Sequence, residues 1–223
     1  TLRSAAVNSN EFVHEAPPAL DERAVVVVCS HGGDTPETVK AAELAKKRGA
    51  AVIGMTYTPG SPLTQFCDYV TDYKFRTDLE ADFSRDKALV PVTIAAELLQ
   101  QTEGFYAYEQ FQDGRKKIDG IVRKAQEQVK DRALHFAETY KDDKIIYTMG
   151  SGASYGAAYI QSICIYMEMQ WVNSSSIHTG EYFHGPFEIT DRNIPFLIQM
   201  SEGRTRELDE RALRFLKKYA ARY

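Results

Sequence analysis

Two side chains of this sequence, Glu168 and His184, are of the types that can move protons on a bound small molecule. Glu168 lies in an apolar stretch with a helical pattern. A carboxylate there is expected to be half-buried and either paired or functional, because burying an unpaired charge is costly. Histidine is the side chain whose ordinary pKa lies closest to neutrality. The pair predicts acid–base chemistry; a salt-bridged structural acid and a loop histidine are the plainer alternatives. Glu181, three positions before His184, is the rival carboxylate.

A hydroxyl-rich turn follows the β-branched run at residues 24–29 and opens a helix. It carries Ser30, Thr35 and Thr38 around two glycines. Hydroxyls and free backbone N–H groups at a helix start suit a phosphate monoester. The sequence therefore predicts a phosphate-binding site at this turn, which we call the phosphate seat. His31 is a further candidate contact to the substrate. A helix cap with a glycine turn explains the same pattern without a ligand.

A second small-residue turn, containing Gly150 and Ser151, follows the apolar residues 145–147 and also opens a helix. It is a second candidate for binding the substrate or its phosphate. Neither turn has the Gly-Lys-Ser/Thr of a nucleotide-binding loop, and Tyr155 interrupts the dinucleotide glycine pattern. No cofactor is therefore predicted. Tyr155 and the later Trp171 are more typical of a core than of a ligand contact.

The composition excludes several classes of protein. The formal net charge is -4 in 223 residues, which does not favour nucleic acid or an anionic membrane surface. No apolar run approaches the roughly 20 residues that a membrane span needs. The three cysteines are scattered, so neither a disulfide framework nor a metal site is expected. A reduced, cytoplasmic location is the plain expectation.

Apolar runs and helical spacing predict an α/β protein. The run at 24–29, the helix that follows it and the run at 51–55 have the spacing of a βαβ unit, which builds parallel sheets. The expected strands are residues 24–29, 51–55, 145–147 and 194–200, with a short edge strand at 68–70, and the expected helices are 36–48, 89–101, 113–140 and 204–219. Residues 74–87 are expected to form a loop. We expect a first subdomain at residues 1–112, a connecting helix at 113–142 and a second subdomain at 143–223.

The sequence also contains a faint internal repeat. Residues 10–14 resemble residues 180–184, and residues 30–37 resemble residues 201–207, at nearly the same offset. Ser30 and Ser201, the first residues of the second pair of matching segments, each follow a predicted strand. If the repeat is real, the chain holds the later part of one copy and the earlier part of the next. Each subdomain is then expected to be incomplete.

The turn at residues 30–38, the Gly-Ser-Pro-Leu at 60–63 and the Gly-Glu-Tyr-Phe-His-Gly-Pro at 180–186 together resemble the sugar isomerase (SIS) domain family. Further segments at 98–104, 161–165 and 187–191 resemble its deglycase branch, whose members act on 6-phosphorylated Amadori compounds. The resemblance covers nearly the whole chain. It implies two doubly wound parallel-sheet subdomains related by duplication, and sites shared within a homodimer.

The resemblance also implies a reaction. The enzyme would cleave 6-phosphofructose-aspartate, or a related fructosyl-amino acid 6-phosphate, to glucose 6-phosphate and the free amino acid. The glutamate at 168 would carry the proton between C1 and C2, and the histidine at 184 would catalyse ring opening or act as a general acid. The phosphate would be held by Ser30 and Thr35, without metal or cofactor. The family's second turn serine is replaced by Gly32.

Two rival functions fit the same residues. A ketose–aldose isomerase or an aminosugar-phosphate deaminase needs the same proton transfer. A sugar-phosphate-sensing module binds phosphate without needing Glu168 and His184. The sequence has no helix-turn-helix segment that would favour a regulator of transcription.

Overall fold

The computed structural model describes residues 3–74 and 85–223 of the chain. The chain divides into two compact units, Thr1–Gln128 and Val129–Tyr223. The helix α4, Tyr108–Tyr140, runs through the boundary between them. It begins earlier than residue 113 because residues 108–112 are also compatible with a helix.

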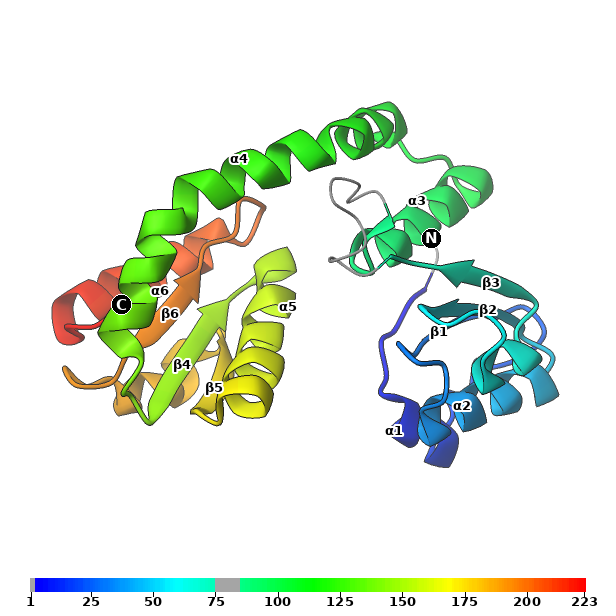
Figure 1. Cartoon of the computed structure of the whole chain (residues 1–223), viewed down its shortest axis with the longest axis horizontal. Helices are drawn as coiled ribbons and strands as arrows, with labels where there is room; N and C mark the ends of the chain where they lie inside the picture. The colour runs from blue at the N-terminus through cyan, green and yellow to red at the C-terminus, as the bar shows by residue number, and fades with distance from the viewer. Residues whose placement is uncertain (1–2, 75–84) are drawn as a thin grey trace. The chain divides into compact units, whose positions relative to one another are not determined.

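The first unit is built on a parallel sheet of three strands in the order β1-β2-β3. Its elements are α1 (Ser9–His14), β1 (Val25–Cys29), α2 (Pro36–Lys47), β2 (Ala51–Thr56), η1 (Pro62–Phe66), β3 (Tyr69–Asp72) and α3 (Leu89–Thr102). The helices α1 and α2 lie together on one side of this sheet (Figure 1). The βαβ unit and the short edge strand are confirmed. The loop expected at 74–87 lies mostly outside the described residues.

The core of the first unit lies between α2 and the sheet. The alanines of α2 pack there, and their small side chains bring the helix close to the strands. The buried residues of this cluster are Leu20, Val28, Ala42, Ala45, Ala50, Val52 and Leu63. Gly49 ends α2 in a left-handed conformation, with φ at 85°, as glycine after a helix commonly does.

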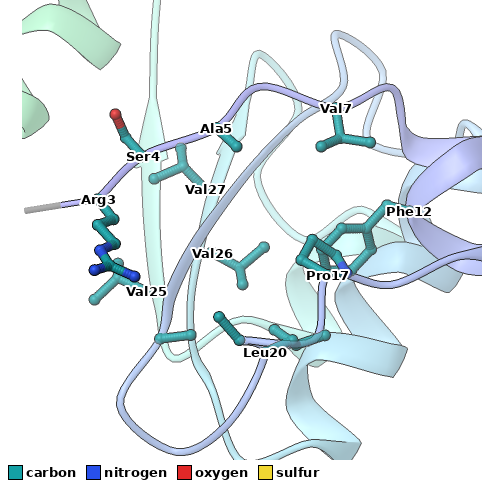
Figure 2. Close-up of a pocket in the computed structure, with 12 residues that line it drawn as sticks. Arg3, Ser4, Ala5, Val7, Phe12, Pro17, Leu20, Val25, Val26 and Val27 are labelled. Atoms are coloured by element: carbon teal, nitrogen blue, oxygen red, sulfur yellow. The ribbon is translucent and has the colours of Figure 1, made fainter.

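The face of β1 that points away from α2 is only partly covered. Val25 and Val27 are 46% and 42% exposed. The segment at residues 3–7 runs beside them, and a cavity of about 320 Å³ lies between this segment and the strand (Figure 2). Its lining is mostly apolar and contains none of the predicted site residues.

The second unit has a parallel sheet in the order β5-β4-β6. Its elements are β4 (Ile145–Gly150), α5 (Gly152–Ile160), the π-helix η4 (Gln161–Met169), β5 (Asn173–His178), η5 (Tyr182–His184), η6 (Pro186–Ile189), β6 (Phe196–Gln199) and α6 (Arg206–Tyr219). The strand β6 is shorter than the apolar run at 194–200. It begins only after Pro195, which has no N–H to donate to the ladder, and it ends at Gln199. An aromatic and aliphatic core packs α6 against the sheet.

The two sheets are complementary parts of one pattern. In the first unit, β1 precedes Ser30 and two later strands complete the sheet. In the second unit, β6 precedes Ser201 and two earlier strands complete the sheet. This is the arrangement that the internal repeat predicts. The parallel α/β fold with incomplete subdomains is therefore confirmed.

Candidate functional site

The turn after β1 brings two of the predicted phosphate ligands together. The Oγ atoms of Ser30 and Thr35 lie 2.8 Å apart, and Ser30 Oγ also accepts a hydrogen bond of 3.1 Å from the N–H of Gly33. Ser30 is buried, whereas Thr35 is exposed at the N-terminal cap of α2. The positive end of a twelve-residue helix therefore begins at a pair of hydroxyls, which is an arrangement suited to a phosphate.

Gly33 lets this turn pack tightly against the segment after β2. Its φ is 69°, and a Cβ built on it would lie 1.8 Å from Ser61 Oγ. Its carbonyl accepts a 2.8 Å hydrogen bond from the N–H of Leu63. Ser61 Oγ is buried and has no hydrogen-bond partner among the described residues. A buried hydroxyl without a partner is costly, so Ser61 is a further candidate for contact with a ligand at this turn.

Replacing Gly33 by alanine should lower the free energy of unfolding of the first unit by about 2 kcal/mol or more. The new methyl group meets Ser61, and the backbone at Gly33 is one that L-residues rarely adopt. Gly60→Ala is the matched control, because Gly60 has a similar φ of 79° with open space around it. Denaturant unfolding of the two variants separates the clash from the backbone strain. Equal losses in both would contradict this packing.

His31 is held by two aromatic residues. Its Nδ1 lies 3.1 Å from the hydroxyl of Tyr73, and its ring is stacked on Tyr57 with centroids 5.1 Å apart. Tyr73 is 2% exposed, and burial raises its pKa to about 12. The side chain of His31 is exposed, so it lies at the surface of the same turn as Ser30.

Thr38 does not join the other two hydroxyls of the turn. It is buried, and its Oγ1 lies 3.0 Å from Ser9 Oγ on α1. This contact holds α1 against α2. A direct role of Thr38 in binding phosphate stays a prediction, and its hydroxyl is already used in packing.

The small-residue turn of the second unit is fixed by a buried carboxylate. Asp209 of α6 is fully buried and accepts hydrogen bonds from Ser151 Oγ at 2.7 Å, Thr179 Oγ1 at 2.6 Å and the N–H of Ser201 at 2.6 Å. These three groups follow β4, β5 and β6. Asp209 therefore ties together the carboxyl ends of the whole sheet. The hydroxyl of Ser151 would therefore have to give up its hydrogen bond to Asp209 before it could donate to a ligand.

A cavity of about 510 Å³ lies beside this network. It is lined by the first residues of α5 and by the turn that precedes α6, namely Gly152, Ala153, Ser154, Met200, Ser201, Glu202, Gly203, Arg204 and Thr205. Gly150 and Ser151, the predicted residues of this turn, are both buried and do not line it.

The expectation of a half-buried Glu168 is wrong for this chain. Glu168 is exposed at the end of the π-helix η4, and so are its apolar neighbours Met167 and Met169. Trp171, expected in the core, is 90% exposed and has a φ of 57°. The helix itself extends to Met169, as expected. Its buried residues, Ser162 and Tyr166, both precede Glu168, and residues 167–170 are exposed.

Glu181 is the N-terminal cap of the short helix η5 and His184 is its last residue, and both are exposed. The N–H of His184 donates to the carbonyl of Glu181 at 2.8 Å, which is a backbone contact. Within the described residues, no hydrogen bond joins the side chains of Glu168, Glu181 and His184. The acid–base pair stays a prediction.

Two general properties can be stated for residues 3–74 and 85–223. They contain no group of three or more His, Cys, Asp or Glu side chains that could hold a metal ion. None of their helices combines the length and apolar character that crossing a membrane requires.

This chain is similar to a family profile and to proteins that are named as deglycases. Residues 3–82 match the profile of the family described as SIS domain. Fructosamine deglycase FrlB of Bacillus subtilis is 45% identical over 98% of this chain and 66% of its own length. Fructoselysine 6-phosphate deglycase of Escherichia coli is 26% identical over 97% of this chain and 62% of its own.

A solved structure agrees with these sequence matches. The structure described as a candidate phosphosugar isomerase of Salmonella typhimurium LT2 superimposes with a TM-score of 0.92 at 46% identity, and covers 96% of this chain and 66% of that one. The chain thus spans just under two thirds of the length of these relatives.

Proposed function

Because this chain belongs to the SIS domain family, we propose that it is part of a deglycase that cleaves a 6-phosphorylated Amadori compound. The products are glucose 6-phosphate and a free amine. The observation that carries the proposal is the Ser30–Thr35 hydroxyl pair at the start of α2, beside the unpartnered Ser61. The names of the two deglycases support the same class of substrate.

The reaction needs one base and one acid. A base removes a C1 proton from the open-chain ketosamine to give an enaminol, and reprotonation at C2 gives the Schiff base of glucose 6-phosphate. Water then adds at C1 and the amine leaves. We assign the C1/C2 proton transfer to Glu168, and ring opening or protonation of the leaving amine to His184. Glu181 is assigned to substrate binding and to the orientation of His184.

Within this class of compounds, the substrate that we propose is 6-phosphofructose-aspartate or a related fructosyl-amino acid 6-phosphate. The similar deglycases are named for fructosamine and fructoselysine 6-phosphate, so the amine is the part of the substrate that differs among these candidates. We place the protein in the cytoplasm, where sugar phosphates are metabolised.

Calorimetry with sorbitol 6-phosphate tests the proposal at the level of binding. This open-chain analogue keeps the phosphate and the hydroxyls but has no carbonyl to react. We expect it to bind, and we expect sorbitol without phosphate to bind far more weakly. Equal affinity for the two compounds would contradict a phosphate seat.

We further propose that the protein is a homodimer with shared active sites. The exposed apolar side chains next to Glu168, which include Met169 at 70% and Trp171 at 90%, support a covered environment for this carboxylate in an assembly. Sedimentation of the protein is expected to give a dimer. A monomer that turns over substrate would contradict this arrangement.

A second candidate is a phosphosugar-binding module that catalyses nothing. It is favoured by the exposure of both Glu168 and His184 and by the lack of a hydrogen bond between them in the described residues. Such a module binds sorbitol 6-phosphate but releases no amine. An isomerase, the third possibility, interconverts fructose 6-phosphate and glucose 6-phosphate instead.

A further inference from the structure

The contact between Tyr73 and His31 fixes more than the position of the histidine ring. Tyr73 is a buried phenol on the residue after β3, and its hydroxyl lies 3.1 Å from His31 Nδ1. That contact is the one hydrogen bond of this hydroxyl within the described residues. Since burial raises the pKa of Tyr73 to about 12, the phenol keeps its proton at neutral pH and can donate it.

The direction of this hydrogen bond determines which nitrogen of His31 carries the ring proton. A buried O–H group needs an acceptor, and the acceptor within the described residues is His31 Nδ1. If Nδ1 were protonated, the Tyr73 hydroxyl would be buried with its proton unmatched. The neutral ring therefore carries its proton on Nε2, and this nitrogen is a donor.

The position of His31 gives that donor a use. His31 is the residue between Ser30 and the two glycines of the turn, it is exposed, and its ring is stacked on Tyr57. The backbone on either side is also fixed: the carbonyl of His31 accepts hydrogen bonds from Thr56 Oγ1 at 3.1 Å and from the N–H of Tyr57 at 3.0 Å. A ring held in this way loses little freedom when it binds a ligand.

We propose that Tyr73 is a positioning residue, which holds His31 in the Nε2–H tautomer so that the ring donates a hydrogen bond to the phosphorylated substrate at the Ser30–Thr35 turn. The part that concerns the substrate rests on the proposed function. The part that concerns the tautomer does not. The two parts have separate tests.

The tautomer is tested on the free protein by NMR. Long-range proton–nitrogen spectra of a sample with labelled histidine, at about pH 8, distinguish the two neutral tautomers. The chain has five histidines, and His31→Gln assigns the signal. We expect the Nε2–H form in the unmodified protein and a mixture of both forms in Tyr73→Phe. An Nδ1–H form, or identical His31 signals in both proteins, would overturn the proposal.

The effect on the ligand is tested by calorimetry with sorbitol 6-phosphate. Tyr73→Phe should weaken binding roughly three- to tenfold, the range for one modest hydrogen bond. Tyr69→Phe, at a 68% exposed tyrosine of β3, is the matched control and should bind as the unmodified protein does. In a His31→Ala background, Tyr73→Phe should cause no further loss, because it acts through the histidine.

The outcomes separate the two proposals. If the unmodified protein binds sorbitol 6-phosphate and Tyr73→Phe binds it equally well, the role of Tyr73 is overturned and the phosphate seat stands. If the unmodified protein does not bind the compound, the phosphate seat and the substrate part of this proposal both fail. The NMR result then still decides the tautomer.

Discussion

Replacing Glu168 by glutamine is expected to lower turnover by roughly a hundred- to ten-thousand-fold, the usual contribution of a general base. Glutamine keeps the shape and the hydrogen bonding of the side chain but cannot accept the C1 proton. Affinity for sorbitol 6-phosphate should change little, because the phosphate is assigned to the Ser30–Thr35 turn. The measurement compares turnover of a fructosyl-amino acid 6-phosphate with calorimetric binding of the analogue, on the protein in its full length.

Glu181→Gln is the control for this prediction, because Glu181 is an exposed carboxylate three positions before His184. Exchange of the C1 proton with solvent deuterium reports the proton transfer directly. If Glu181→Gln abolishes exchange while Glu168→Gln leaves it intact, the assignment of the base is wrong. His184→Ala should also lower turnover, and part of the loss should return with a substrate locked in the open-chain form if ring opening is its task.

The double replacement Ser30→Ala and Thr35→Ala is expected to weaken binding of sorbitol 6-phosphate by an order of magnitude or more. Hydrogen bonds to a charged phosphate contribute about 1–3 kcal/mol each. The two hydroxyls lie 2.8 Å apart, so one phosphate can contact both. Calorimetry measures the loss.

A matched control for this pair is Thr102→Ala with Ser174→Ala. These hydroxyls donate to the carbonyls of Leu98 and Ile146 within their own helix and sheet. The control should bind sorbitol 6-phosphate as the unmodified protein does. Unchanged affinity after loss of Ser30 and Thr35 hydroxyls would rule out this turn as the phosphate seat.

The fold was predictable because its signals are local. The β-branched run before Ser30 and the helix spacing up to Gly49 indicate a βαβ unit, and the structure has one. The hydroxyls of Ser30 and Thr35 are five positions apart, so a single turn is enough to bring them together. The parallel sheets of both units follow from the same local reasoning.

The contacts that sequence reasoning missed join residues far apart in the chain. Ser61 reaches Gly33 because two strands end side by side, and Tyr73 reaches His31 across forty-two positions. Asp209 accepts from residues after three different strands. In the sequence, Asp209 is one of three acids near the start of α6, with Glu207 and Glu210, so nothing marks it as the centre of a network.

The exposure of Glu168 could not be predicted from the sequence either. The spacing of apolar residues predicts a helix, but it does not show which turns of that helix are buried in the core. Met167, Met169 and Trp171 are apolar, but they are exposed in the second unit. Their apolar character therefore did not mean that Glu168 is buried in this unit.

The proposed deglycase activity is tested most directly by product analysis with synthetic 6-phosphorylated Amadori compounds in deuterated water. The panel contains 6-phosphofructose-aspartate and fructoselysine 6-phosphate, with fructose 6-phosphate included to detect an isomerase. Glucose 6-phosphate and free amino acid are expected in equal amounts, with deuterium incorporated at C2. Binding of these compounds without release of amine, or conversion of fructose 6-phosphate alone, would contradict it.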